Sequence, residues 1–135
     1  MECDQFAIED NRPLTKSERN LARWMLEHGI PEAKEFLPQL ELAEVTPFRC
    51  ECGCATIDFK IRGMPHAPPG VHILADFVFG DEANLNGIFI DEKQGILSGM
   101  EVFGYTGEAP KSLPDPEQLV DVDSWNRKIR GKERG

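Results

Sequence analysis

The stretch Arg49-Cys50-Glu51-Cys52-Gly53-Cys54 divides the chain into two parts with different hydrophobic patterns, and it holds three of the four cysteines. Before it, apolar residues recur at helical spacing, and for about fifty residues after it they alternate with polar residues as in strands. We expect strands over 45–50 and 54–61, joined by a turn at Cys52-Gly53, because glycine tolerates a positive φ. This hairpin would place Cys50 and Cys54 opposite each other near its tip.

The first helix is predicted over residues 16–28. Thr15-Lys-Ser-Glu18 matches a capping box, in which Thr15 caps the helix and Glu18 reaches back to the Thr15 N–H. Gly29 is a natural residue to end the helix. The face that we expect to pack on the sheet consists of Leu21, Trp24, Met25 and His28.

A second helix is predicted to begin at Pro31, which suits a first helical turn. Its apolar stripe consists of Phe36, Leu37, Leu40 and Ala43. Pro38 lies inside this pattern and must kink or divide the helix, with a break near Leu37. About two residues join the two helices, so they are expected to form an antiparallel or angled hairpin.

Further strands are predicted at 71–79, 87–91 and 96–105, after a loop at 63–70 that holds three prolines and His66. Glu92-Lys-Gln-Gly95 is a second hairpin signal. No helices alternate with these strands, so a doubly wound fold is excluded. The predicted fold is α+β, with an N-terminal helical hairpin packed on an antiparallel meander sheet of four to five strands.

The length of 135 residues suits one domain with an ordinary core. We expect a loose N-terminal lead-in at 1–13, a single α+β domain at 14–125 and a frayed C-terminal tail at 126–135. Residues 117–125, near the end of the domain, are expected to contain one helical turn.

The formal net charge is −9, which argues against nucleic-acid binding and permits a basic protein partner. Solubility alone is the alternative explanation for this charge. No apolar run approaches the ~20 residues that a membrane span needs. The first residues lack the basic and apolar regions of a signal peptide, so a cytoplasmic location is expected.

Cys50, Cys52 and Cys54 are the candidate metal ligands, with His66 as a fourth, because structural zinc takes four nitrogen or sulfur ligands. His72 could replace His66. Along a regular strand the three cysteines would lie ~7 Å apart, too far for one ion unless the turn folds them together. The favoured interpretation is that they are small buried residues or free thiols, and that no cofactor binds; zinc is the alternative.

No catalytic or cofactor-binding residue is predicted. A Cys–His pair is formally available, but lone histidines such as His28 and His72 are more often surface residues. Asp58 and Asp76 lie opposite the main apolar faces of their strands, so solvated sheet surface is the simplest account of them. The common phosphate-loop, dinucleotide-binding, esterase and zinc-protease motifs do not occur.

Three segments carry a resemblance to a known family: Cys50-Glu-Cys-Gly-Cys-Ala-Thr-Ile-Asp-Phe59, Gly95-Ile-Leu-Ser-Gly-Met-Glu-Val-Phe-Gly-Tyr105 and Leu113-Pro-Asp-Pro116. Together they resemble small uncharacterised bacterial proteins with a C-x-C-G-C-x-S/T-I-D segment before a strand pair. The resemblance covers about two thirds of the chain. It implies a domain of unknown function, so it supplies no activity and no site residues that could be carried over.

The sequence favours a non-enzymatic, acidic interaction module, such as an immunity-type protein that blocks a basic toxin by charge complementarity. The rival function is a small zinc- or thiol-dependent protein that uses the cysteine cluster. A catalytic function ranks third, because no set of nucleophile, base and orienting group can be named. The oligomeric state stays open.

Overall fold

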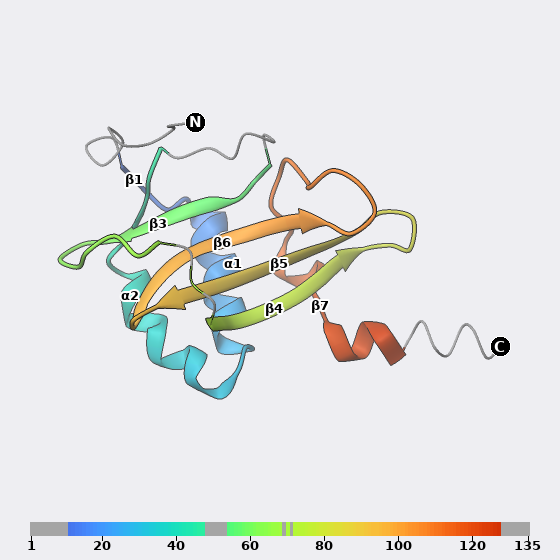
Figure 1. The fold of residues 1–135 in the computed structure, drawn as a ribbon, viewed down its shortest axis with the longest axis horizontal. Coiled ribbons are helices and arrows are strands. Elements are labelled where there is room, and N and C mark those ends of the chain that lie inside the picture. The colour runs from blue at the N-terminus through green and yellow to red at the C-terminus, as the bar shows by residue number, and fades with distance from the viewer. Residues whose placement is uncertain (1–10, 48–53, 69, 71, 128–135) are drawn as a thin grey trace.

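The computed structural model describes residues 11–47, 54–68, 70 and 72–127. They form an α+β fold in which an antiparallel sheet carries the helix Lys16–Glu27 on one face (Figure 1). Residues 122–127 are also helical. The other elements are β1 (Arg12–Pro13), α1 (Lys16–Glu27), η2 (Pro31–Phe36), α2 (Leu37–Leu40), β2 (Ala43–Val45), β3 (Ile57–Ile61), β4 (His72–Gly80), β5 (Leu85–Lys93), β6 (Ile96–Gly104), η3 (Pro116–Gln118) and β7 (Val120–Asp121).

Helix α1 forms where the sequence predicts it, and it packs on the sheet. Thr15 is the N-cap and His28 the C-cap. The expected buried face is confirmed for Leu21 and Met25, which are 1% and 0% exposed. Trp24 is only half-buried, because it lies at the edge of this face; its ring stacks on that of His28 at 4.1 Å.

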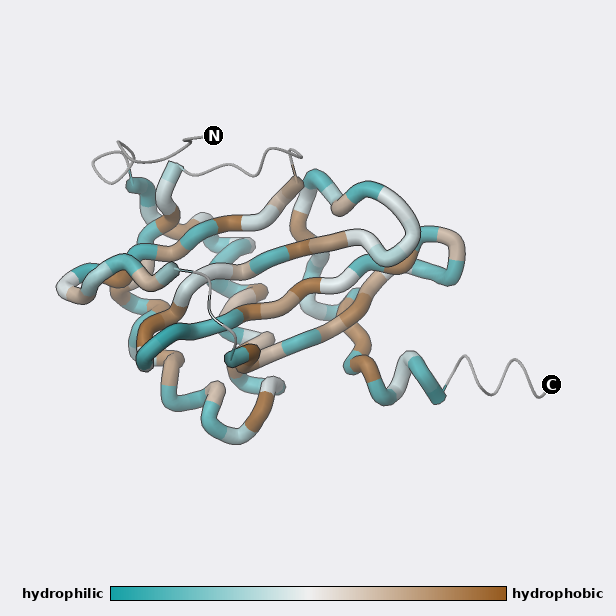
Figure 2. Tube along the Cα trace, in the orientation of Figure 1, coloured by the Kyte–Doolittle hydropathy of each residue, from teal (hydrophilic) through white to brown (hydrophobic). Residues whose placement is uncertain are grey.

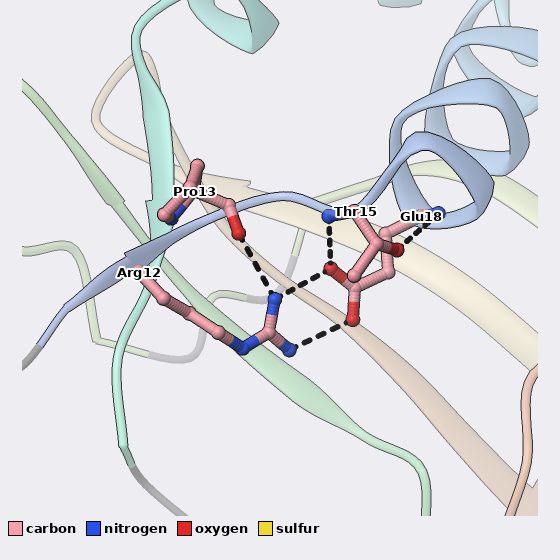
Figure 3. A network of polar contacts seen from close by, with 4 residues as sticks. All are labelled: Arg12, Pro13, Thr15 and Glu18. Carbon is pink, nitrogen blue, oxygen red and sulfur yellow. Dashed lines mark hydrogen bonds and ion pairs between the residues drawn. The ribbon is translucent and has the colours of Figure 1, made fainter.

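The predicted capping box is part of a larger network that ties β1 to α1 (Figure 3). The Thr15 N–H donates to Glu18 Oε1 at 2.9 Å, and the Glu18 N–H donates to Thr15 Oγ1 at 3.1 Å. The Arg12 guanidinium donates to both Glu18 carboxylate oxygens at 2.8 Å. Burial alone would raise the pKa of Glu18, but the hydrogen bonds from Arg12 and Thr15 outweigh it and lower that pKa.

The second predicted helix is divided at Leu37, as Pro38 indicated. Its first part, η2, is a 3-10 helix, and only the four residues of α2 are α-helical. Pro38 has no N–H to donate to the preceding turn, which favours such a change of helix type. The expected helical hairpin is therefore one α-helix followed by a short, mixed helical segment.

The prediction of a four- to five-stranded meander is wrong in strand number and in topology. The described strands form one seven-stranded sheet with the order β1-β2-β3-β6-β5-β4-β7. Only β4, β5 and β6 form a meander. Strand β3 pairs with β6 through Ile57–Met100 and Asp58–Gly99, a pairing between distant residues that hydrophobic alternation cannot specify.

The predicted first hairpin is confirmed in its described part and corrected in its boundaries. Strands β2 and β3 pair antiparallel, with Val45 opposite Phe59. Strand β2 begins at Ala43 and ends at Val45, and residues 54–56 lie outside β3 because the Ala55 N–H bonds to the Pro110 carbonyl instead. The turn at Cys52-Gly53, and so the pairing of Cys50 with Cys54, lies outside the described residues.

The second hairpin forms where the sequence predicts it, but β5 runs from Leu85 to Lys93 rather than over 87–91, so the turn has two residues. Lys93 pairs with Ile96, and Gln94 and Gly95 between them have φ values of 56° and 84°. Two residues with positive φ are what a tight two-residue hairpin turn requires, because this turn matches the twist of the flanking strands.

Two-residue strands complete the sheet at both edges. Strand β1 corrects the expectation of a loose lead-in over residues 1–13, because Arg12 and Pro13 pair with β2. At the other edge β7 pairs with Phe77 and Val78 of β4. Nearby, the Ile30 N–H donates to the Leu74 carbonyl of β4 at 2.9 Å.

The core lies between α1 and one face of the sheet. Hydrophobic and hydrophilic residues follow one another along the strands, and α1 lies behind the face that is turned to the viewer (Figure 2). None of the described helices is long and apolar enough to cross a membrane. The largest fully buried side chains include Phe59, Leu21, Met25, Leu26, Leu40, Ile61, Ile88, Ile90, Leu97 and Met100.

Candidate interaction face

The structure describes two of the four predicted metal ligands. Cys54 is half-buried against the core, and its Sγ lies 3.2 Å from Thr56 Oγ1. His66 hydrogen-bonds through Nε2 to Asp58 Oδ2 at 2.7 Å. Cys50 and Cys52 lie outside the described residues. Within the described part of the chain, no three His, Cys, Asp or Glu side chains are grouped so that they could hold a metal ion.

The other two histidines are engaged elsewhere. His28 Nδ1 lies 2.8 Å from the Trp24 carbonyl, at the end of α1. His72 Nδ1 bonds to Glu92 on the neighbouring strand, and its Nε2 lies 3.5 Å from Glu32 of η2. These contacts place both residues away from His66, so the predicted histidines do not form one site.

The helix-free face of the sheet carries the side chains that alternate with the core residues, and we call it the open face. Residues paired across antiparallel strands share a face, so the register groups them into rows. Three rows cross β4, β5 and β6, the first extending to β3: Ile73, Asp91, Gly99 and Asp58; then Asp76, Phe89 and Glu101; then Val78, Gly87 and Phe103.

Asp91 in the first row is 1% exposed and incompletely bonded. Its Oδ2 accepts the Gly70 N–H at 3.0 Å. Its Oδ1 is buried and has no hydrogen-bond partner among the described residues. Burial raises the pKa of Asp91, and the nearby charge of Asp58 raises it further. Hydrogen bonds from backbone N–H groups, such as that of Gly70, lower this pKa but do not cancel the rise. Asp91 is therefore a buried acid whose charged form is poorly stabilised.

The proline-containing loop covers this end of the open face and accounts for the burial of Asp91. Ser98 Oγ donates to the Ala67 and Pro68 carbonyls, at 3.2 and 2.9 Å. Together with the His66 contact to Asp58, these bonds hold the loop on the first row. The second and third rows lie beyond these contacts.

The second row places an aromatic ring between two carboxylates. Phe89 pairs with Asp76 on one side and with Glu101 on the other. Burial raises the pKa of Asp76. Burial also raises the pKa of Glu101, and repulsion from Asp91 and Asp58 adds to that shift. Within the described chain, neither the Asp76 nor the Glu101 side chain has a hydrogen bond or an ion pair.

The third row adds Phe103, whose ring makes tilted and edge-to-face contacts with the rings of Phe89 and Tyr105. The Phe103 ring lies over Gly87, where a Cβ atom would sit 2.3 Å from a ring carbon. Ring centroids are 6.0 Å apart for Phe89 and Phe103, and 5.0 Å apart for Phe103 and Tyr105. Tyr105 is 52% exposed. The open face thus combines the unpaired carboxylates of Asp76 and Glu101 with an aromatic strip of Phe89, Phe103 and Tyr105, of which Tyr105 is exposed.

Sequence reasoning found part of this face. Asp58 and Asp76 lie opposite the core, as alternation predicted, although Asp58 is partly buried rather than fully solvated. Asp91 and Glu101 were not identified. The alternation within 88–92 and 98–102 could have placed both on the polar face, but their grouping depends on the pairing of β5 with β6.

No family model, curated protein or solved structure matches the chain. The resemblance to small bacterial proteins with the cysteine-containing segment therefore stays a prediction. The argument for function rests on the site alone.

Proposed function

We propose that the protein is a non-enzymatic interaction module that binds a basic protein partner through the open face, in the manner of an immunity protein. The observation that carries the proposal is the gathering of Asp58, Asp76, Asp91 and Glu101 on one helix-free face. Within the described chain, Asp76 and Glu101 have neither a hydrogen bond nor an ion pair, so no described cation compensates their charges.

The electrostatics favour a cationic partner for two reasons. A net charge of −9 attracts a basic protein at long range and increases the association rate. At short range, a bound cation relieves the repulsion that Asp58 and Asp91 exert on Glu101. Binding is therefore expected to weaken as salt is added.

A catalytic function has less support. His66 and Asp58 form a pair that could orient a base, and Thr46 Oγ1 also donates to Asp58 Oδ2 at 2.8 Å. However, no hydroxyl or thiol among the described side chains hydrogen-bonds to His66. A nucleophile next to the base is what such chemistry requires.

The proposal is tested with an immobilised poly-lysine surface as the basic probe. The variant Asp76→Asn/Glu101→Gln removes two charges from the open face. Glu27→Gln/Glu35→Gln removes two exposed charges from the helical side and is the matched control. We expect the first variant to associate about tenfold more slowly at low salt, and the control to change little.

Equal losses in the two variants would overturn the proposal, because net charge rather than the open face would then govern binding. A salt-independent association rate for the unaltered protein would remove the electrostatic argument altogether.

The rival function, a small zinc- or thiol-dependent protein, depends on Cys50, Cys52, Cys54 and His66. No described contact favours it, and His66 is already bound to Asp58. We expect no stoichiometric metal and no effect of a chelator on the melting temperature. One tightly bound zinc per chain, lost in Cys52→Ser, would give the metal function first place.

A further inference from the structure

We infer that the row of Asp76, Phe89 and Glu101 is a binding subsite for an arginine side chain of the basic partner. The inference rests on the proposed function and specifies it. It assigns the recognition of the partner to one row of the open face and to one kind of side chain.

The geometry of the row suits a planar cation. Directly opposed residues in antiparallel strands have Cβ atoms about 4.5–5.5 Å apart. The Phe89 ring is therefore flanked by a carboxylate on each side, one on β4 and one on β6. A cation within ~6 Å of an aromatic centroid is attracted to the ring face. A guanidinium over Phe89 lies within reach of both carboxylates.

The charges in and beside the row lack the partner that such a cation would provide. No described lysine or arginine forms an ion pair with Asp76, Asp91 or Glu101. In the adjoining row, the buried Oδ1 of Asp91 has no hydrogen-bond partner in the described chain, and this charge acts on Glu101. Asp76 and Glu101 therefore lack the counter-charge that a bound cation would supply.

The row is accessible, whereas the acids of the first row are largely covered. The proline-containing loop is hydrogen-bonded to Asp58 and Asp91 of the first row and to Ser98, which precedes Gly99 of that row. Asp76 is exposed, and Phe89 and Glu101 are half-buried. A ligand can therefore reach the second row without displacement of these contacts.

The aromatic strip distinguishes arginine from lysine. A guanidinium is planar and weakly hydrated, so it stacks on a ring while it hydrogen-bonds to carboxylates. A lysine ammonium is compact and strongly hydrated, and it gains less from the ring. Phe103 and Tyr105 extend the aromatic surface beyond Phe89, which gives neighbouring groups of an arginine-containing segment further contact area.

The test compares two synthetic peptides of equal length and charge, six Arg-Gly repeats and six Lys-Gly repeats. Their dissociation constants are measured with the full chain by isothermal titration calorimetry. We expect the unaltered protein to bind the arginine peptide at least threefold more tightly than the lysine peptide. Equal affinities would overturn the inference without any variant being needed.

Phe89→Leu then removes the ring and keeps an apolar side chain. We expect it to abolish the preference for arginine, while Phe89→Tyr retains the preference. Phe36→Leu is the matched control, because Phe36 is a half-buried phenylalanine of η2, outside the open face. Equal urea midpoints for the unaltered protein and Phe89→Leu establish that the fold is intact.

The outcomes separate the inference from the proposed function. If Asp76→Asn/Glu101→Gln weakens both peptides but Phe89→Leu leaves the preference for arginine, the subsite is wrong and the acidic interaction face stands. If Asp76→Asn/Glu101→Gln weakens neither peptide more than the control Glu27→Gln/Glu35→Gln does, both fail.

Discussion

Glu18 and Asp91 are two buried carboxylates with opposite surroundings. They are 8% and 1% exposed. Glu18 accepts two hydrogen bonds from Arg12 and one from the Thr15 N–H, and its pKa is lowered. Asp91 accepts one hydrogen bond from the Gly70 N–H, its Oδ1 accepts none within the described chain, and its pKa is raised.

The difference shows that partners, not burial, decide what a buried acid does here. Both side chains lose water, which penalises the charged form of each. At Glu18, hydrogen bonds from Arg12 and Thr15 replace that water and favour the charged form. At Asp91 the hydrogen bonds do not compensate for the lost water, so this acid weakens the fold at neutral pH.

Glu18→Ala is expected to have the largest effect of the predictions that test this contrast. It removes the capping box and leaves Arg12 without its carboxylate, so unfolding by urea should require about 2 kcal/mol less free energy. The value allows for solvent screening, because the Arg12 side chain is 40% exposed.

Glu27→Ala is the control for this measurement. Glu27 is an exposed residue of the same helix. A surface substitution of this kind usually changes the free energy of unfolding by less than about 0.5 kcal/mol. A loss in Glu18→Ala no larger than in Glu27→Ala would show that the network of Figure 3 contributes nothing measurable.

Asp91→Asn is expected to act in the other direction. The amide keeps an acceptor for the Gly70 N–H and removes the buried charge. The free energy of unfolding at pH 7 should rise by about 1 kcal/mol, at the lower end of the cost of burying a polar group without a hydrogen-bond partner. A clear loss of stability would show that an unidentified donor stabilises the charged Oδ1.

The two acids should also differ in how their effects change with pH. The pKa of Glu18 is lowered, so its contribution is present above the ordinary Glu value of ~4.3 and is lost as the pH falls through the folded-state pKa. The pKa of Asp91 is raised, so its penalty is absent below ~3.9 and complete above the folded-state pKa.

Urea titrations of the unaltered protein and Asp91→Asn over this range check the sign. Their free energies of unfolding should converge as the pH falls toward 4, as the penalty at Asp91 disappears. For Glu18→Gln, the deficit relative to the unaltered protein should shrink only below pH ~4.3, where Glu18 of the unaltered protein takes up a proton and loses its ion pair with Arg12. If the difference in free energy of unfolding between the unaltered protein and Asp91→Asn widened as the pH fell, the raised pKa of Asp91 would be contradicted.

The smallest expected effect concerns salt. Raising sodium chloride from 0.05 to 0.5 M should screen the repulsion on the open face and stabilise the protein by about 0.5 kcal/mol. This rise in the free energy of unfolding with salt should be smaller in Asp76→Asn/Glu101→Gln than in Glu27→Gln/Glu35→Gln. Identical increments in the two variants would indicate that the acids of the second row do not interact with their neighbours.

Local signals made the N-terminal part of the fold predictable. Thr15 and Glu18 lie within one helical turn, and the Gln94-Gly95 turn lies within one hairpin, so neighbouring residues are enough to specify them. Pro38 likewise marks the change of helix type. Each of these features is determined by interactions between residues that lie within about four positions of one another.

Long-range pairings were not predictable in the same way. The contact of β3 with β6 joins segments about forty residues apart, and β1 and β7 are too short to show alternation. The candidate site depends on these pairings, because Asp58 and Asp91 meet only when both lie beside Gly99. The sequence therefore predicted acids on a polar face and missed their grouping.

The two-residue strands at the sheet edges bear on how copies of this chain behave at high concentration. An uncovered edge strand offers free N–H and C=O groups that can extend the sheet into a neighbouring molecule. Pro13 in β1 has no N–H to offer, and β4 is covered by β7 and by the Ile30 contact to Leu74. Extension of the sheet into a neighbouring copy is thereby opposed at both edges, which favours separate molecules even in a crowded solution.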